Sequence, residues 1–245
     1  MQPPRILVLG PVKVLADGET RSLGAHLRTF LAGLVVSVNH AVRTDTLVDL
    51  VWGGDPPSAL ETSVHTLATK VRELLGHDAL VMEDHAYVLL AGVDDIDACV
   101  FERDAALAEE ALECRPARAA ELARSALGLW RGPAYCDLAD VDPFRLESIR
   151  LDQLRQGVSE TLIRAELSVG HYTRAIPMLD SMLSEAPYRE PLWAELITAL
   201  GAVRRRGDAI TAYRRYEAVM NGLGLEPAPE IVEALARATR ATTPA

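Results

Sequence analysis

The chain has 245 residues, of which 49% are hydrophobic and 24% are charged, and its formal net charge is −10. This composition is typical of a globular protein long enough for two domains, and it excludes a disordered chain. Because no run of ~18 apolar residues is present and the N-terminus lacks a signal-peptide pattern, we expect a cytoplasmic protein without membrane contact.

The first part of the chain predicts a mixed α/β domain. Short β-type runs at residues 6–9 and 12–15 precede a turn signal at Asp17-Gly18. Apolar residues then recur at helical spacing over residues 27–35. Thr44-Asp45 forms an N-cap pair for a second, shorter helix, which ends at Trp52-Gly53-Gly54. The order of these segments is strands first and then helices.

A third predicted helix, after Asp55-Pro56-Pro57, is the clearest amphipathic segment of this half of the chain. Its narrow apolar stripe consists of Leu60, Val64, Leu67, Val71 and Leu74. We expect the opposite face to carry Ser58, Glu61, Thr62, His65, Thr69 and Arg72, with Thr66 and Lys70 at its flanks. Two β-type runs, at 79–82 and 86–90, enclose a short tip and predict a hairpin, the wing of a winged helix.

The chain changes character at residues 92–95, and from there the pattern is helical. Gly and Pro loop signals separate candidate helices at 101–112, 117–130, 144–167, 173–183, 191–203, 208–220 and 229–240. A turn glycine and an alanine five residues later, Gly170 with Ala175, recur after 37 residues as Gly207 with Ala212. This repeat resembles a tetratricopeptide pair, an architecture that usually binds partners and does not catalyse reactions.

Motifs for catalysis or cofactor binding are absent from the sequence. It has no phosphate-binding loop, no dinucleotide fingerprint and no nucleophile elbow. The six histidines and three cysteines lack the spacing of metal ligands, and we expect the cysteines to be reduced. We therefore expect no enzyme activity, no metal and no cofactor.

Motifs and their order together resemble the small Streptomyces antibiotic regulatory proteins. In the first half the similar segments are LVLGPVKVLADGE, LRTFLAGLVV and TLVDLVWGGDPPSA. In the second half WRG, REPLW and GLGLEP occur in this order, which is the more specific part of the resemblance. The expected fold is mainly α, with an N-terminal OmpR-type winged helix-turn-helix (α+β) at residues 1–92. An all-α, tetratricopeptide-like bacterial transcriptional activation domain is expected at residues 93–245.

The resemblance implies a transcriptional activator of a secondary-metabolite gene cluster, as in antibiotic biosynthesis. Members of the family bind direct repeats in double-stranded DNA as tandem homodimers and contact RNA polymerase or its sigma factor. The third helix would enter the major groove, and the hairpin would grip an adjacent minor groove or its phosphates. The expected DNA-binding residues are Arg28, Arg43, Thr62, His65, Thr66, Thr69, Lys70 and Arg72.

The charge distribution leaves a second interpretation open. Residues 1–92 hold seven basic and ten acidic residues, and the hairpin tip carries Glu83 and Asp84 where phosphate contacts are expected. Because phosphate contacts supply most of the sequence-independent affinity for DNA, carboxylates at these positions repel it. The alternative is a winged-helix protein that has lost DNA binding and acts as a scaffold, or as a regulator that binds a protein or a small molecule.

Overall fold

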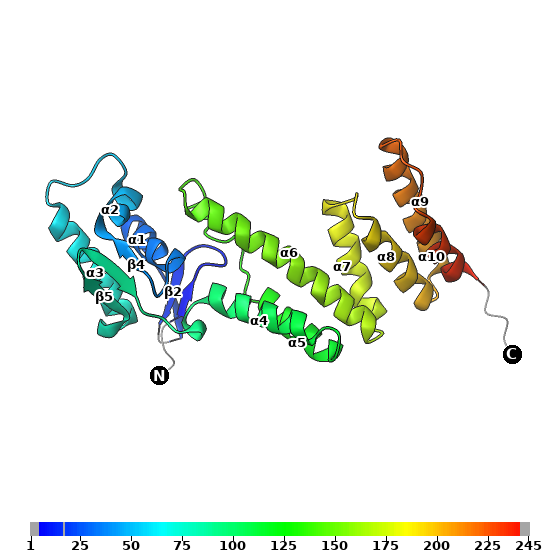
Figure 1. The fold of residues 1–245 in the computed structure, drawn as a ribbon, viewed down its shortest axis with the longest axis horizontal. Helices are drawn as coiled ribbons and strands as arrows, with labels where there is room; N and C mark the ends of the chain where they lie inside the picture. Colours follow the sequence, from blue (N-terminus) through cyan, green and yellow to red (C-terminus); the bar gives the residue numbers. More distant parts are fainter. Residues whose placement is uncertain (1–4, 17, 241–245) are drawn as a thin grey trace. The chain divides into compact units, whose positions relative to one another are not determined.

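The computed structural model of the protein describes residues 5–16 and 18–240 (Figure 1). Most of these residues lie in helices, and two small antiparallel sheets lie near the N-terminus. The predicted fold class, a winged helix-turn-helix followed by helical repeats, is confirmed. Within the described part of the chain, no helix is both long and apolar enough to cross a bilayer.

The chain divides into two compact units. The first comprises Met1–Glu109 with Leu122–Ser159, and the second comprises Glu110–Glu121 with Glu160–Ala245. The two compact units do not coincide with the expected domains at 1–92 and 93–245. The domain boundary expected at residue 92 therefore stays a prediction.

The first unit begins with a three-stranded antiparallel sheet. Its strands are β1 (Arg5–Leu7), β2 (Lys13–Ala16) and β3 (Glu19–Ser22), in the order β1-β2-β3. Of the predicted turn between β2 and β3, Asp17 lies outside the described residues, and Gly18 has a φ of +79°. A left-handed φ favours glycine because other residues meet steric strain there.

The helix-turn-helix and its hairpin follow in the predicted order. The helices are α1 (Ala25–Val36), α2 (Thr44–Trp52) and α3 (Leu60–Leu75), and the second sheet, in the order β4-β6-β5, contains β4 (Ala41–Arg43), β5 (Leu80–Glu83) and β6 (Ala86–Leu89). The rings of Phe30 in α1 and Tyr87 in β6 meet edge to face, with centroids 5.8 Å apart. Buried side chains of this kind contribute about 1.5–3 kcal/mol each, so they anchor the helices on the sheet.

A buried carboxylate joins the first sheet to the helices that follow the hairpin. Asp97, the first residue of α4 (Asp97–Ala111), is 1% exposed. Its oxygens accept hydrogen bonds from the backbone N–H of Val8 at 2.7 Å and of Leu9 at 3.1 Å. Because these two donors bind a side chain, the strand that was expected to reach Leu9 ends at Leu7.

Arg131 binds the same loop from another position. One guanidinium nitrogen lies 3.3 Å from the Asp97 carboxylate, and another donates to the Pro11 carbonyl at 3.1 Å. The backbone N–H of Arg131 also donates to the Leu9 carbonyl at 2.8 Å. Burial raises the pKa of Asp97, while its two backbone donors and Arg131 oppose the rise. The β1–β2 connection is therefore held by residues far along the chain.

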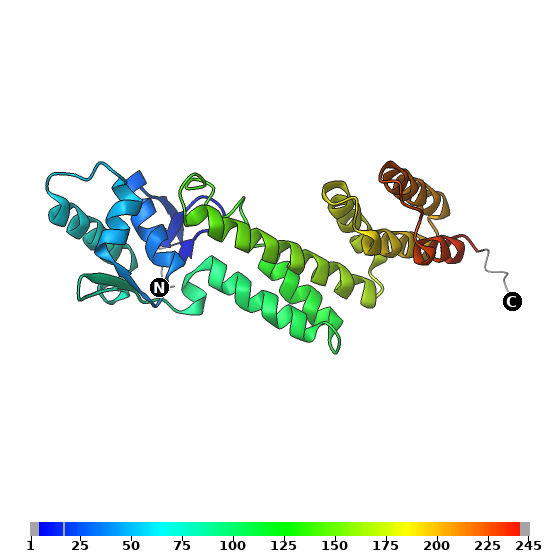
Figure 2. The same cartoon turned by 45° about the horizontal axis from the view of Figure 1, so that its top comes forward.

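Two further helices, α5 (Pro116–Leu127) and α6 (Phe144–Ser168), follow α4. In the first unit the start of α6 runs beside α4, where Arg150 forms an ion pair with Glu102 (Figure 2). The helix predicted at 117–130 ends earlier, at Leu127. Trp130 leaves the helix and meets the ring of Phe101 edge to face, with centroids 5.3 Å apart.

The second unit contains α7 (Tyr172–Glu185), α8 (Glu190–Ala202), α9 (Arg206–Gly222) and α10 (Pro229–Thr239). They enclose one apolar core in which Trp193 and Tyr216 are fully buried. The repeated alanines Ala175 and Ala212 lie in this core, as the repeat indicates.

The two repeat turns differ from each other. Gly170 has a φ of +79°, as expected for a turn glycine, but in the second turn the left-handed residue is Arg204, with a φ of +62°. Gly207, which was expected in that turn, lies in the first turn of α9. The second turn therefore comes a few residues earlier than the predicted repeat places it.

We expect Gly201→Ala to destabilise the second unit. A Cβ at Gly201 in α8 would lie 2.6 Å from the Cβ of Ala238 in α10, so the two helices would have to separate. Overpacking of this kind costs about 1–3 kcal/mol. Urea unfolding of the full chain measures the loss. The matched control is Gly207→Ala, where a Cβ meets nothing within 4 Å. Equal unfolding free energies for the two variants would contradict the close crossing.

We expect Asp97→Ala to lower the free energy of unfolding by about 3 kcal/mol, because it leaves two buried N–H groups and Arg131 without their acceptor. Urea unfolding followed by circular dichroism measures the change. Asp152→Ala, which removes an exposed carboxylate on α6, serves as the control. If both variants unfold at the same urea concentration, the N–H groups of Val8 and Leu9 do not depend on Asp97.

Candidate nucleic-acid interface

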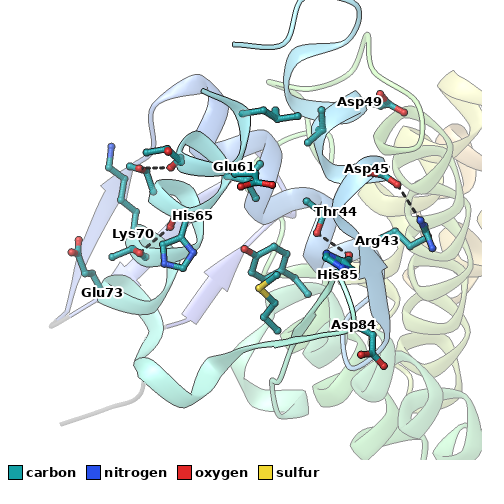
Figure 3. A pocket seen from close by; sticks show the side chains of 18 residues that line it. Arg43, Thr44, Asp45, Asp49, Glu61, His65, Lys70, Glu73, Asp84 and His85 are labelled. Atoms are coloured by element: carbon teal, nitrogen blue, oxygen red, sulfur yellow. Dashed lines mark hydrogen bonds and ion pairs between the residues drawn. The ribbon is translucent and has the colours of Figure 1, made fainter. Parts of the chain in front are cut away.

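A groove of about 1120 Å³ lies between α2, α3 and the β5–β6 hairpin (Figure 3). The exposed side chains of α3 that line it are Glu61, Thr62, His65, Thr66, Thr69, Lys70 and Glu73. They form one face of the helix, because Val64, Leu67 and Val71 are buried on the other face. The exposed face of α3 therefore forms one wall of the groove.

Most of the predicted DNA-binding residues come together in this groove. Those that line it are Arg43, Thr62, His65, Thr66, Thr69 and Lys70. They come from one helix and from the end of β4, which leads directly into α2. The third helix supplies five of these six residues, and β4 supplies Arg43.

Arg28 and Arg72 do not line the groove, and both guanidinium groups have partners within the protein. Arg72 Nε donates to the Leu80 carbonyl at 2.9 Å, which joins α3 to the start of β5. Arg28 pairs with Asp137 at 3.2 Å and donates to the Leu23 carbonyl at 3.0 Å. Contact of these two arginines with DNA stays a prediction, and the geometry of the groove gives it no support.

Glu73 lies where Arg72 was expected on the exposed face of α3. The helical period placed Arg72 on that face, but the residue is only partly exposed, whereas Glu73 is exposed and lines the groove. The face therefore carries one more carboxylate and one fewer cation than the sequence pattern indicated.

The hairpin tip is fixed against the start of α2. Asp84 and His85 form the two-residue turn between the paired residues Glu83 and Ala86, with φ values of +43° and +60°. Positive φ values at both central residues are the geometry of the type I′ turn, which commonly closes β-hairpins. The His85 carbonyl accepts hydrogen bonds from the Thr44 backbone N–H at 2.9 Å and from its hydroxyl at 2.8 Å. The wing is thus joined to the helix-turn-helix at its tip.

Carboxylates outnumber cations among the described residues that line the groove. The carboxylates are Asp45, Asp49, Glu61, Glu73 and Asp84, and the cations are Arg43 and Lys70. Arg43 Nη2 lies 3.0 Å from Asp45, and both side chains are largely exposed. An exposed ion pair is worth at most about 1 kcal/mol, so a phosphate can replace Asp45 as the partner of Arg43.

Hydroxyl groups along α3 are bound to the backbone of the helix itself. Ser63, Thr66 and Thr69 donate to the carbonyl four residues earlier, at 3.0, 2.8 and 2.9 Å. Ser and Thr often make this bond inside helices, where it uses the single hydroxyl hydrogen. Thr66 and Thr69 are exposed residues that line the groove.

The floor of the groove is less polar than its walls. Val64 and Tyr87 are buried there, and Met82 of β5 is exposed at its side. Burial raises the pKa of the Tyr87 phenol, and the charge of Arg72 opposes the rise, so this group stays neutral at physiological pH. Within residues 5–16 and 18–240, no group of three or more His, Cys, Asp or Glu side chains could hold a metal ion.

Comparison with known proteins assigns the chain to a family. Residues 96–238 match the family described as bacterial transcriptional activator domain. The regulatory protein AfsR of Streptomyces griseus is 32% identical over 97% of this chain, which spans 24% of AfsR. The transcriptional regulatory protein MoaR1 of Mycobacterium tuberculosis is 32% identical over 91% of this chain and 75% of its own length.

A solved structure supports the same assignment. Mycobacterium tuberculosis EmbR, in complex with a low-affinity phosphopeptide, is 28% identical and has a TM-score of 0.80. The similarity covers 97% of this chain and 65% of that one. The relatives are named as regulatory or transcriptional regulatory proteins, and the chain spans only about a quarter of the length of AfsR. The chain therefore belongs to the Streptomyces antibiotic regulatory protein family of transcriptional regulators, which carry the bacterial transcriptional activator domain.

Proposed function

We propose that this regulator is a DNA-binding transcriptional activator that inserts α3 into the major groove of double-stranded DNA. The observation that supports this proposal is the groove between α3 and the fixed hairpin. It presents one continuous exposed face of a helix, and a DNA major groove about 12 Å wide admits such a helix. The proposed contact residues are Arg43, Thr62, His65, Thr66, Thr69 and Lys70.

In this proposal two copies of the chain bind direct repeats beside a promoter. Two recognition helices reach the same side of a duplex when their half-sites lie about one helical turn, roughly 34 Å, apart. The helical repeats contact RNA polymerase or its sigma factor, a role that fits a surface built for partners. The controlled genes belong to a secondary-metabolite cluster. The relatives named as regulatory proteins support the role in transcription.

The second candidate function is a winged helix that no longer binds DNA and serves as a protein- or small-molecule-binding regulator or scaffold. The five carboxylates that line the groove favour it, since they repel phosphates. Asp84 would repel phosphates at the hairpin tip, where the wing of a winged helix approaches the DNA backbone.

Selection from a random DNA pool separates the two candidates. The enriched sequence is then titrated by fluorescence anisotropy at two salt concentrations. A direct repeat spaced near one helical turn, with affinity that falls as salt rises, supports the activator. If a folded and monodisperse sample enriches no sequence, the DNA-binding proposal is wrong and the second candidate takes its place.

We expect Lys70→Ala to weaken binding by a similar factor on all DNA sequences. Loss of one phosphate contact should reduce the slope of log affinity against log salt by about 1. Lys13→Ala is the matched control, because Lys13 lies on β2 and does not line the groove. Anisotropy titrations at several salt concentrations measure both variants. Identical slopes for the two would place Lys70 away from the DNA backbone.

We expect Asp84→Asn to raise the affinity for non-specific DNA about threefold at low salt, because it removes a repulsive charge from the hairpin tip. Asparagine tolerates the left-handed φ at this position, so the turn is preserved. The gain should shrink as salt screens the charge. Asp152→Asn on α6 is the control. No gain at low salt would mean that the tip points away from DNA.

A further inference from the structure

We propose that the middle of α3 distinguishes bases by their exocyclic amino groups. Thr66 and Thr69 accept hydrogen bonds from N4 of cytosine or N6 of adenine through their hydroxyl oxygens. The inference rests on the proposed function, because it assumes that the groove holds the DNA major groove.

The first step of the argument is the state of the two hydroxyl groups. A threonine hydroxyl has one hydrogen and two lone pairs. In Thr66 and Thr69 the hydrogen is directed to the carbonyls of Thr62 and His65, at 2.8 and 2.9 Å. A hydroxyl bound in this way offers only lone pairs to a ligand. It accepts hydrogen bonds from a base, and it has no hydrogen left for a phosphate oxygen.

The second step is the chemistry of the residues around them. Thr62, Thr66, Thr69 and Glu73 follow one another at steps of four, three and four residues, so they form one exposed line along α3. Glu61 lies beside the start of this line, and carboxylates can only accept hydrogen bonds. This line is therefore rich in acceptors, while Lys70 beside it carries the positive charge for a phosphate, so the line itself is better suited to donors on the base edges.

The third step is the pattern of the major groove. The only hydrogen-bond donors on its base edges are the amino groups of adenine and cytosine. Guanine and thymine present carbonyl oxygens at the equivalent places, and these would meet the lone pairs of the threonines. An acceptor therefore separates adenine or cytosine from guanine or thymine on the strand that it faces.

The spacing of the two threonines suits neighbouring base pairs. Three residues advance a helix by about 4.5 Å, and base pairs are stacked about 3.4 Å apart. We therefore expect two nearby positions of the selected site to accept adenine or cytosine and to exclude guanine and thymine.

The test removes single amino groups from the DNA and single acceptors from the protein. In the selected site each adenine is replaced by purine, and each cytosine by pyrimidin-2-one, one position at a time. The full-length variants are Thr66→Val and Thr69→Val, which lose the hydroxyl, and Thr66→Ser and Thr69→Ser, which keep it. Thr211→Val is the matched control, because Thr211 donates to the Gly207 carbonyl at 3.0 Å in α9, outside the groove.

Wild-type protein should lose about three- to tenfold in affinity when the amino group at a contacted position is removed, the size expected for one hydrogen bond. The matching Val variant should lose no further affinity when the amino group at that position is removed. The Ser variants and Thr211→Val should lose affinity as wild type does. Circular dichroism verifies that each variant is folded.

Two results overturn the inference alone. One is tight, sequence-selective binding in which no Val variant changes the response to amino removal. The other is enrichment of guanine or thymine at the positions that respond to the threonines. If the full chain enriches no DNA sequence at all, the proposed function fails and the inference fails with it. The two failures are thus distinguishable in one set of titrations.

Discussion

The hydrogen bonds between the buried Asp97 carboxylate and the backbone of Val8 and Leu9 are the contact on which the first unit depends. A buried charge costs several kcal/mol unless donors surround it, and buried N–H groups are costly without an acceptor. Each side of this contact therefore needs the other. The winged helix gains a fixed edge, and α4 gains a fixed start. The part of the sequence that resembles a winged helix is therefore not a complete folded unit. Its β1–β2 connection is also held by Asp97 in α4, which lies outside residues 1–92.

Strongly periodic segments could be predicted from the sequence, while long-range polar contacts could not. The narrow stripe of α3 and the two β-type runs after it were sufficient to predict a helix followed by a hairpin, because these patterns are local. Asp97 carried no such signal, since its partners lie 89 and 88 residues away. The second repeat turn was misplaced for a related reason. Glycine is the usual left-handed residue, but Arg204 adopts that conformation here.

The residues of the candidate site could be predicted only where the position of a residue around the helix axis decides whether it faces the groove. The helical period gives the direction of each Cβ, which placed Thr62, Thr66 and Lys70 on the groove face. It does not say where a long side chain ends. Arg72 begins near the same face, but its guanidinium group reaches the first strand of the hairpin. Nor does composition reveal pairing, and the ion pair between Arg43 and Asp45 appears only in three dimensions.

The sparse positive charge of the groove has a consequence for how such a regulator would search a chromosome. In the proposed function, the few cations of the groove would displace few counterions, so attraction to arbitrary DNA would be weak. A bacterial genome offers millions of non-cognate sites, and a protein with little affinity for them is not titrated by this excess. It also gains little from sliding along the duplex or from electrostatic steering, so it would find its operator more slowly. If the proposed function holds, occupancy of the promoter would depend on cooperative neighbours and on base contacts, which would make the response steep in protein concentration.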